Sequence, residues 1–424
     1  MINIKRKEDC CGCSACAQRC PKQCIKVVED CEGFLYPKVD ETKCINCHLC
    51  EKVCPVVHQA EPRMSMESYA AYNMDNIVRK DSSSGGVFTL LAEKVIDEGG
   101  VVFGATWNEK WRVVHTYTET KEGIIQFRGS KYVQSIIGET YKQVEAFLKS
   151  GRKVLFSGTP CQIAGLRLFL RKEYENLLTV DFICHGVPSP GVFRWYLQEE
   201  INNYAARKGR KNTVSFLPIH SIPKGDVLMP EGLSINGIRF RDKCSGWKKF
   251  SFVLLLAEAS ADGKQNSVSL SYTLEQNSFL KGFLNDLYLR PSCHKCPAKS
   301  LKSGSDITLG DFWGIESLLP EIDDDKGVSA IIVNSDKGKE LLHIIDIELY
   351  EVQYDELTDR NTALIRSCPI TPKRTEFFKE DGFTFEENVK RLTKKPFSMK
   401  TLVYRIVRKI IPNMVVVKLK RLLR

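Results

Sequence analysis

Apolar and polar positions alternate along much of the chain in a pattern typical of mixed α/β proteins. The apolar run from Val154 to Phe156 predicts a buried strand. The turn "SGTP" follows it, and Cys161 then opens a segment with the apolar spacing of an amphipathic helix. The runs "LTVDFIC" (178–184) and "ITLGD" (307–311) predict two more strands. Because strand ends in open α/β sheets converge on a ligand crevice, the residues that end these strands are candidates for chemistry.

A second strand–helix pattern lies upstream. The stretch "SSSGG", from Ser82 to Gly86, precedes the helical pattern "VFTLLAEKVIDEGG", and the strand pattern "VVFGATW" follows. Ser and Gly at a helix start present free N–H groups, which suit phosphate or flavin oxygens, although an ordinary capped helix explains them equally well. The stretch "FRGSKYVQS" places Lys131 between small residues, as in an anion site or a plain loop. These residues alone do not name a ligand.

The N-terminal segment is dominated by two cysteine runs. "CCGCSACAQRCP" and "CINCHLCEKVCP" both show C-x2-C-x2-C-x3-C-P spacing, which is the signature of bacterial two-cluster ferredoxins. In that arrangement the fourth cysteine of each run binds the other cluster. The first 4Fe–4S cluster is therefore expected on Cys10, Cys13, Cys16 and Cys54. The second is expected on Cys44, Cys47, Cys50 and Cys20.

Two further features complete the prediction for this segment. The residues between the runs predict two short strands around a Glu-Gly turn. A pair of zinc sites is the alternative, but zinc motifs usually offer C-x2-C pairs rather than this quartet twice. The remaining cysteines, Cys11, Cys24 and Cys31, are out of register and are interpreted as packing thiols.

Composition indicates the cellular compartment and excludes some classes of protein. The chain has 424 residues and 17 cysteines, and its start, "MINIKRKEDCC", lacks the apolar segment of a secretory signal. The cysteines are therefore expected to be thiols or thiolates in the cytoplasm. No apolar run reaches membrane-spanning length. Eight Lys or Arg and no acidic residue fall between Phe397 and Arg424, so the rest of the chain is near neutral, which argues against a nucleic-acid surface.

The basic C-terminal segment has a pattern of its own. Leu402, Ile406 and Ile410 share one helical face, with basic residues elsewhere and a break at Pro412. Such an amphipathic tail is typical of a peripheral anchor at the inner face of a membrane or of a partner-docking helix, and a solvated terminal helix is the alternative.

Four cysteines outside the ferredoxin runs belong together in this interpretation. Cys161 and Cys184 end predicted strands, while Cys293 and Cys296 form the C-x2-C of "RPSCHKCPAK". Four such thiols suit a third 4Fe–4S cluster or a structural zinc. A nucleophilic Cys161, or a C-x2-C redox pair, remains open on the residues alone.

Seven motifs in order carry a family resemblance. They are "SSSGGVFTLLAEKVIDEGGVVFGA", "RGSKYVQS", "VLFSGTPCQIAGL", "DFICHGVPSP", "FRDKCSGWKKFSF", "LRPSCHKCPAKS" and "SDITLGDFWGI". Together they resemble the coenzyme F420 hydrogenase/dehydrogenase β-subunit family, here with an N-terminal dicluster ferredoxin. The resemblance implies an iron–sulfur flavoprotein that binds FAD.

Site residues follow from the resemblance position by position. The family's cluster cysteines fall on Cys161, Cys184, Cys293 and Cys296. Its flavin-binding region falls on Ser83, Ser84, Gly85, Gly86, Ser130, Lys131 and Tyr132, with Asp311 as a further flavin neighbour. His185 is interpreted as a structural histidine, with proton relay as the alternative, and Cys244 and Cys368 as structural thiols.

The expected organisation has four parts. A ferredoxin domain (1–62) precedes a flavin-binding region (63–150), a region with the third cluster (151–385) and a basic helical tail (386–424). The fold class is α+β or mixed α/β, and residues 214–238 form a long Pro- and Gly-rich excursion of the kind that serves as a lid or a partner-binding element.

The expected function is electron transfer between clusters and FAD. The expected partners are a ferredoxin or another electron-transfer protein and an unidentified organic hydride acceptor or donor, with the catalytic residues unassigned. Two alternatives have different chemistry. One is an adapter subunit that passes electrons to a partner enzyme without substrate chemistry of its own, and the other is a structural protein stabilised by zinc.

Overall fold

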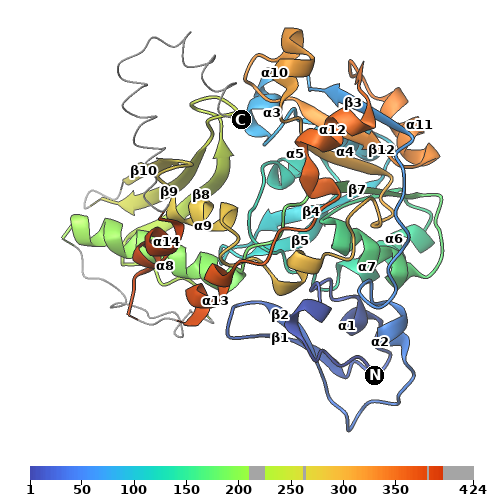
Figure 1. Cartoon of the computed structure of the whole chain (residues 1–424), viewed down its shortest axis with the longest axis horizontal. Coiled ribbons are helices and arrows are strands. Elements are labelled where there is room, and N and C mark those ends of the chain that lie inside the picture. Colours follow the sequence, from blue (N-terminus) through green and yellow to red (C-terminus); the bar gives the residue numbers. More distant parts are fainter. Residues whose placement is uncertain (210–224, 261–263, 380–381, 395–424) are drawn as a thin grey trace, which may run out of the picture.

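The computed structural model describes residues 1–209, 225–260, 264–379 and 382–394. It is a mixed α/β protein, as the sequence predicts, with a small cysteine-rich domain at the N-terminus. Figure 1 shows this domain beneath a large central sheet, with a smaller sheet beside them. The basic tail from Phe397 to Arg424, and residues 214–224 of the expected excursion, lie outside the described residues.

The central sheet has eight strands in the order β13-β3-β12-β11-β7-β6-β4-β5. Its middle is parallel, from β4 through β6 and β7 to β11, and antiparallel pairs complete both sides. The strands are β3 (Glu67–Ala71), β4 (Val101–Trp107), β5 (Val113–Thr118), β6 (Val154–Ser157), β7 (Leu177–Phe182), β11 (Ile307–Asp311), β12 (Ser329–Val333) and β13 (Tyr350–Glu351).

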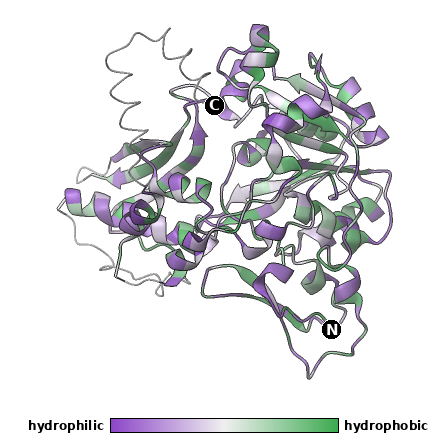
Figure 2. Cartoon of the chain, in the orientation of Figure 1, coloured by the Kyte–Doolittle hydropathy of each residue, from purple (hydrophilic) through white to green (hydrophobic). Residues whose placement is uncertain are grey.

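Helices cover both faces of this sheet because its central strands are apolar on both sides. Phe103 and Phe156 pack in a core with α6 and α7, whereas Val102 and Leu155, the alternate positions, pack with α4 and α11. Figure 2 shows the resulting hydrophobic interior and more polar outer helices. The helices of this part are α3 (Asn76–Asp81), α4 (Val87–Asp97), α5 (Lys121–Ile124), α6 (Thr140–Lys149), α7 (Pro160–Leu170), α10 (Ile315–Leu318), α11 (Asp336–Ile344) and α12 (Tyr354–Arg360).

A second, antiparallel sheet packs with a separate set of helices. Its strands, in the order β10-β9-β8, are β8 (Leu233–Asp242), β9 (Ser251–Ala259) and β10 (Gln265–Thr273). Its helices are α8 (Pro190–Arg207), α9 (Ser278–Leu284), α13 (Pro372–Lys379) and α14 (Phe385–Thr393). Two expected boundaries fall inside these elements: residues 233–238 belong to β8, and position 386 lies in α14, whose Phe385, Val389 and Leu392 are buried in this core.

The N-terminal domain consists of β1 (Ile25–Glu29), β2 (Leu35–Val39), α1 (Ala15–Arg19) and α2 (Leu49–Lys52). Strands β1 and β2 form the hairpin that the sequence predicts. Cys31 lies exposed in its turn, so the interpretation of Cys31 as a packing thiol is wrong.

Charged side chains dock this domain onto the rest of the chain. Arg194 of α8 pairs with Glu29, and Arg374 Nη2 donates to Glu32 Oε2 at 2.6 Å. Both arginine side chains are largely buried at the junction. Because breaking a buried ion pair leaves an unpaired charge, these contacts hold the domain in one position.

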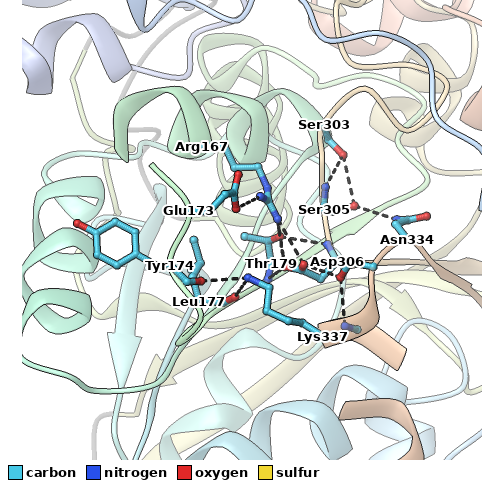
Figure 3. Close-up of polar contacts among 12 residues, drawn as sticks. Arg167, Glu173, Tyr174, Leu177, Thr179, Ser303, Ser305, Asp306, Asn334 and Lys337 are labelled. Atoms are coloured by element: carbon cyan, nitrogen blue, oxygen red, sulfur yellow. Dashed lines mark hydrogen bonds and ion pairs between the residues drawn. The ribbon is translucent and has the colours of Figure 1, made fainter. Parts of the chain in front are cut away.

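A buried carboxylate fixes the strands that carry the site (Figure 3). Asp306, just before β11, accepts from the backbone N–H and the hydroxyl of Thr179 in β7, at 2.7 and 2.6 Å. It also pairs with Arg167 of α7 and accepts from the hydroxyl of Ser335. One side chain therefore sets β11, β7 and α7 relative to one another, and Cys161 lies in the first turn of α7.

None of the helices among the described residues is both long enough and apolar enough to cross a lipid bilayer.

Candidate cluster sites and cofactor region

The predicted ligand cysteines line three pockets. The first ferredoxin pocket is lined by Cys10, Cys13, Cys16 and Cys54. The second ferredoxin pocket is lined by Cys20, Cys44, Cys47 and Cys50. The third pocket is lined by Cys161, Cys184, Cys293 and Cys296. The structure thus groups the cysteines in the sets expected from the motifs, including the exchange of the fourth cysteine between the two runs; their role as ligands stays a prediction.

The two ferredoxin loops have matching backbone turns. Ser14 and His48 adopt left-handed conformations, with φ of 61° and 58°, immediately before α1 and α2. Gly12 and Asn46, two residues earlier in each loop, also have positive φ. Such turns direct successive N–H groups inward and form the concave nests seen at Fe–S sites. Ile2 adds a backbone N–H 3.3 Å from Cys50 Sγ.

The third pocket forms where strands of the central sheet end. Cys161 follows β6, Cys184 follows β7, and the short helix η4 (Pro291–Lys295) brings Cys293 beside them. The backbone N–H of Val187 lies 3.4 Å from Cys293 Sγ. These contacts orient the sulfurs into a pocket whose empty space, open mouth included, is about 590 Å³.

The protonation of these thiols distinguishes a ligand from a nucleophile. Burial raises the pKa of Cys184 to about 12 and that of Cys296 to about 11. A hydrogen bond with Cys11, together with burial, raises the pKa of Cys161 well above its usual value. A nucleophilic cysteine needs a lowered pKa, whereas a bound metal deprotonates its thiols outright. The local electrostatics therefore argue against a nucleophilic Cys161.

The geometry bears on the kind of metal site as well. Among the described residues, no three His, Cys, Asp or Glu side chains lie close enough together to hold a single metal ion. A four-iron cluster takes its thiolates at the corners of a larger body, so its ligands stand farther apart than those of one ion.

The predicted flavin residues come together where α4 begins. Ser130 N–H donates to Ser83 Oγ at 2.6 Å, and Ser84 Oγ donates to the carbonyls of Gly310 and Val328. Segments 83–86, 129–132 and 310–313 therefore meet at one place. The N–H of Gly85 donates to Ser329 Oγ at 3.0 Å, so the expectation of a free amide is wrong at that residue, because the start of α4 packs onto β12.

Lys131 supplies a cationic group at this place. It is half-buried, and its Nζ donates to the carbonyls of Arg128 and Gly129 at 3.1 and 3.2 Å. Burial lowers the pKa of its ammonium to about 7. An anionic ligand beside Lys131 would restore its charge.

Asp311 orients a buried arginine that sequence reasoning missed. Its carboxylate accepts from Arg241 Nη1 and, at 3.0 Å, from Trp247 Nε1. The Arg241 side chain is 3% exposed, and among the described residues its Nε has no hydrogen-bond partner. A buried donor without an acceptor is costly, so the donor set fits a ligand with phosphate or carbonyl oxygens, such as FAD. Arg241 lies in the motif "FRDKCSGWKKFSF", but its spacing gave no signal for a role.

The third pocket adjoins the place where segments 83–86, 129–132 and 310–313 meet, through two contacts. Ile183, in the pocket wall, donates its N–H to Leu309 O at 2.8 Å, next to Gly310. The ring of His185 lies edge-on to Phe283 at 5.4 Å, and Phe283 packs against Tyr132 at 4.9 Å. His185 Nε2 is 2.7 Å from Asp286 Oδ1, so its ring is held in place.

Comparisons with known proteins agree with this architecture. The sequence model of the coenzyme F420 hydrogenase/dehydrogenase β subunit matches residues 68–140 with its N-terminal part and residues 151–215 and 227–356 with its C-terminal part. The chain belongs to this family. A 4Fe–4S binding domain matches residues 37–57, so this β-subunit family member is an iron–sulfur protein of an oxidoreductase and electron-transfer family.

Two known proteins are similar to part of this chain. The coenzyme F420-dependent sulfite reductase of Methanocaldococcus jannaschii is 29% identical over 189 residues, which is 42% of this chain but 28% of that protein. The chain thus matches little more than a quarter of that relative. A chain of the F420-reducing [NiFe] hydrogenase complex from Methanosarcina barkeri is 17% identical, with a TM-score of 0.43 over 71% of this chain and 91% of that chain.

Proposed function

We propose that this protein is an iron–sulfur flavoprotein oxidoreductase that passes electrons between ferredoxin-type clusters and FAD and exchanges hydride with an organic substrate. The proposal is based on the order in which the candidate cofactor sites follow one another through the molecule. The second ferredoxin pocket, the first ferredoxin pocket and the third pocket are each lined by four predicted ligands. The third pocket in turn adjoins the segments around Lys131 and Asp311.

The cofactors divide the chemistry between them. When bound, 4Fe–4S clusters supply single-electron transfer, and FAD interconverts single electrons with hydride. The chain's own residues hold these groups and exclude water. The ligands would be Cys10, Cys13, Cys16 and Cys54, then Cys20, Cys44, Cys47 and Cys50, and then Cys161, Cys184, Cys293 and Cys296.

The flavin residues have distinct tasks in this proposal. Lys131 and Arg241, whose Nε has no hydrogen-bond partner among the described residues, would bind phosphate or flavin oxygens. The hydrogen bond between Ser83 and Ser130 would hold the two flavin-binding segments together. Tyr132 would contact the cofactor with a side chain whose ring is held in place by Phe240 and Phe283. Asp311 would hold the guanidinium of Arg241 in position by accepting its hydrogen bond.

Two partners follow from the surface and from the relatives. Cys47 is exposed beside Ile45, which is 57% exposed, so a ferredoxin or another electron-transfer protein would approach the second ferredoxin pocket. The organic partner would be a hydride acceptor or donor. The deazaflavin coenzyme F420, which the names of both relatives contain, is the first compound to test.

Metal and flavin analysis of anaerobically purified protein tests the proposal. We expect about twelve irons in three clusters and one FAD per chain. Bound zinc in place of iron would contradict it. Full iron without flavin would instead favour an adapter subunit that feeds a partner enzyme, and a screen of metabolite oxidation by the holoprotein would then separate the two functions.

A further inference from the structure

A fifth thiol lies in the wall between two of the pockets. Cys11, which falls outside the ferredoxin spacing, lines both the first ferredoxin pocket and the third pocket. It is 3% exposed, and its side chain is in hydrogen-bonding contact with Cys161 on one side and Cys13 on the other. One residue therefore touches a predicted ligand of each site.

Distant parts of the chain fix the backbone on either side of this thiol. Arg290 Nε donates to Cys10 O at 2.7 Å, and Gln134 Nε2 donates to Cys11 O at 3.0 Å. Gly12 follows with φ of 76°, and a Cβ there would lie 2.7 Å from Gln134 Nε2. The segment thus approaches its neighbours as closely as glycine permits, so its backbone is held in one place.

We propose that Cys11 is a positioning residue for electron transfer between the first ferredoxin cluster and the third cluster, with its thiol, between Cys13 and Cys161, donating a hydrogen bond to a ligand sulfur. The inference rests on the proposed function, because it requires clusters in both pockets. One electron leaves one cluster and reduces the other, while Cys11 keeps its proton and is neither oxidised nor reduced.

Two physical arguments support this role. Electron tunnelling weakens steeply with distance and is faster through packed atoms than across a gap, and Cys11 fills the wall with a polarisable sulfur. Hydrogen bonds to cluster sulfurs also raise the reduction potential, since they stabilise the more negative reduced state. Cys11 would therefore fill the gap between the clusters and favour reduction of the cluster whose ligand accepts its S–H.

The cysteine count argues against a ligand role for Cys11. A cubane takes one thiolate at each of its four irons, and Cys161, Cys184, Cys293 and Cys296 already provide four. Cys24 shows the difference: it lies 3.3 Å from Cys20 and lines only the second ferredoxin pocket, so it does not connect two sites.

The test uses anaerobic holoprotein of Cys11→Ala and Cys11→Ser. Cys31→Ser is the matched control, since Cys31 is an exposed thiol of the same domain outside all three pockets. Iron content and cluster signals in electron paramagnetic resonance come first, because about twelve irons in the unaltered protein establish the three clusters independently of Cys11. The reduction of the third cluster by reduced methyl viologen is then measured in samples frozen at successive times. Cys10→Ala removes a first-cluster ligand, so it gives the rate at which methyl viologen reduces the third cluster directly.

We expect all irons to remain in both Cys11 variants. In Cys11→Ala the potential of the cluster whose ligand accepts the S–H should fall, and reduction of the third cluster should slow by about tenfold or more. Cys11→Ser, which keeps a donor, should recover part of both losses, and Cys31→Ser should match the unaltered protein. Unchanged rate and potential in Cys11→Ala would overturn the proposal, and so would loss of about four irons in both variants, which would make Cys11 a ligand.

Discussion

The guanidinium of Arg290 lies against Cys10: its Nε donates to the carbonyl of Cys10 at 2.7 Å, and its Nη2 lies 3.5 Å from the sulfur. Arg290 is fully buried and also donates to Leu35 O and to Gln134 Oε1. A single cation from the segment before η4 therefore neighbours the first ferredoxin pocket and holds the domain that contains it.

Arg290→Gln should lower the reduction potential of the first cluster, because the positive charge that stabilises its reduced state is lost. The free energy of unfolding should also fall by about 1–3 kcal/mol, since buried carbonyls lose their donors. Redox titration followed by electron paramagnetic resonance measures the potential. Arg374→Gln is the control, because Arg374 contacts Glu32 at the same junction without contacting a ligand cysteine; equal shifts in both variants would contradict a specific charge effect.

Cys161→Ala should lose about four of twelve irons, or leave a labile three-iron cluster, while both ferredoxin clusters survive. Reduction of those two clusters by an external donor should persist, and transfer to flavin should slow sharply. Iron analysis and stopped-flow absorbance measure both effects, with Cys244→Ala as the control because Cys244 is exposed and outside the third pocket. Full iron with intact cluster-to-flavin transfer would reopen the nucleophile interpretation.

The sequence predicts the cysteine sets well because their spacing is local. Three thiols on one loop need only a tight turn, and the convergence of Cys161 and Cys184 needs only that neighbouring strands end at one edge. The place of Cys11 could not be predicted in the same way. It depends on how the ferredoxin domain docks, through contacts such as Arg194 with Glu29 that join residues 165 positions apart.

The predicted flavin-binding residues show what the sequence alone could not predict. The motif "SSSGG" predicts free N–H groups at a helix start, but whether an amide is free depends on what packs against it. In the fold, Gly85 donates to Ser329 of β12, whereas Arg241 of β8 brings in a buried donor. Strand β8 belongs to a different sheet, so only tertiary structure places Arg241 beside Asp311.

FAD affinity should depend on pH through Lys131. Its pKa is about 7 in the free protein, so the side chain is charged below pH 7 and increasingly neutral above it. An anionic cofactor binds the charged form, so binding takes up a proton above pH 7, and affinity should fall by up to about tenfold per pH unit there. Calorimetric titration of flavin-free protein in buffers of different ionisation enthalpy measures the proton uptake.

Two variants complete this test. Lys131→Glu should weaken FAD binding at every pH, because a negative charge then faces the cofactor's oxygens. Lys131→Arg, which remains charged, should bind FAD with little pH dependence. Full flavin occupancy in Lys131→Glu would place Lys131 outside the site.

Asp311→Asn should destabilise the protein more than Trp247→Phe. Asp311 balances the charge of Arg241, so neutralising it leaves a buried cation unpaired, at a cost of about 3–5 kcal/mol. Trp247→Phe removes the indole N–H donated to Asp311 and part of a fully buried ring, which together cost about 2–3 kcal/mol. Urea unfolding measures both, and flavin occupancy should fall in Asp311→Asn alone. Unchanged stability and flavin occupancy in Asp311→Asn would show that Arg241 does not depend on this carboxylate.

Ile45→Glu should slow reduction by a reduced ferredoxin without slowing reduction by dithionite. Ile45 and Cys47 are exposed at the second ferredoxin pocket, and exposed Lys22 lines the same pocket, a surface that suits an acidic redox protein. A buried charge in an apolar contact weakens docking, whereas a small reductant needs no docking surface. Stopped-flow absorbance with each reductant measures the two rates. Ile77→Glu is the control, since Ile77 is 72% exposed on α3 of the central-sheet region. If Ile45→Glu and Ile77→Glu react with ferredoxin at the rate of the unaltered protein, electrons reach the clusters by another face.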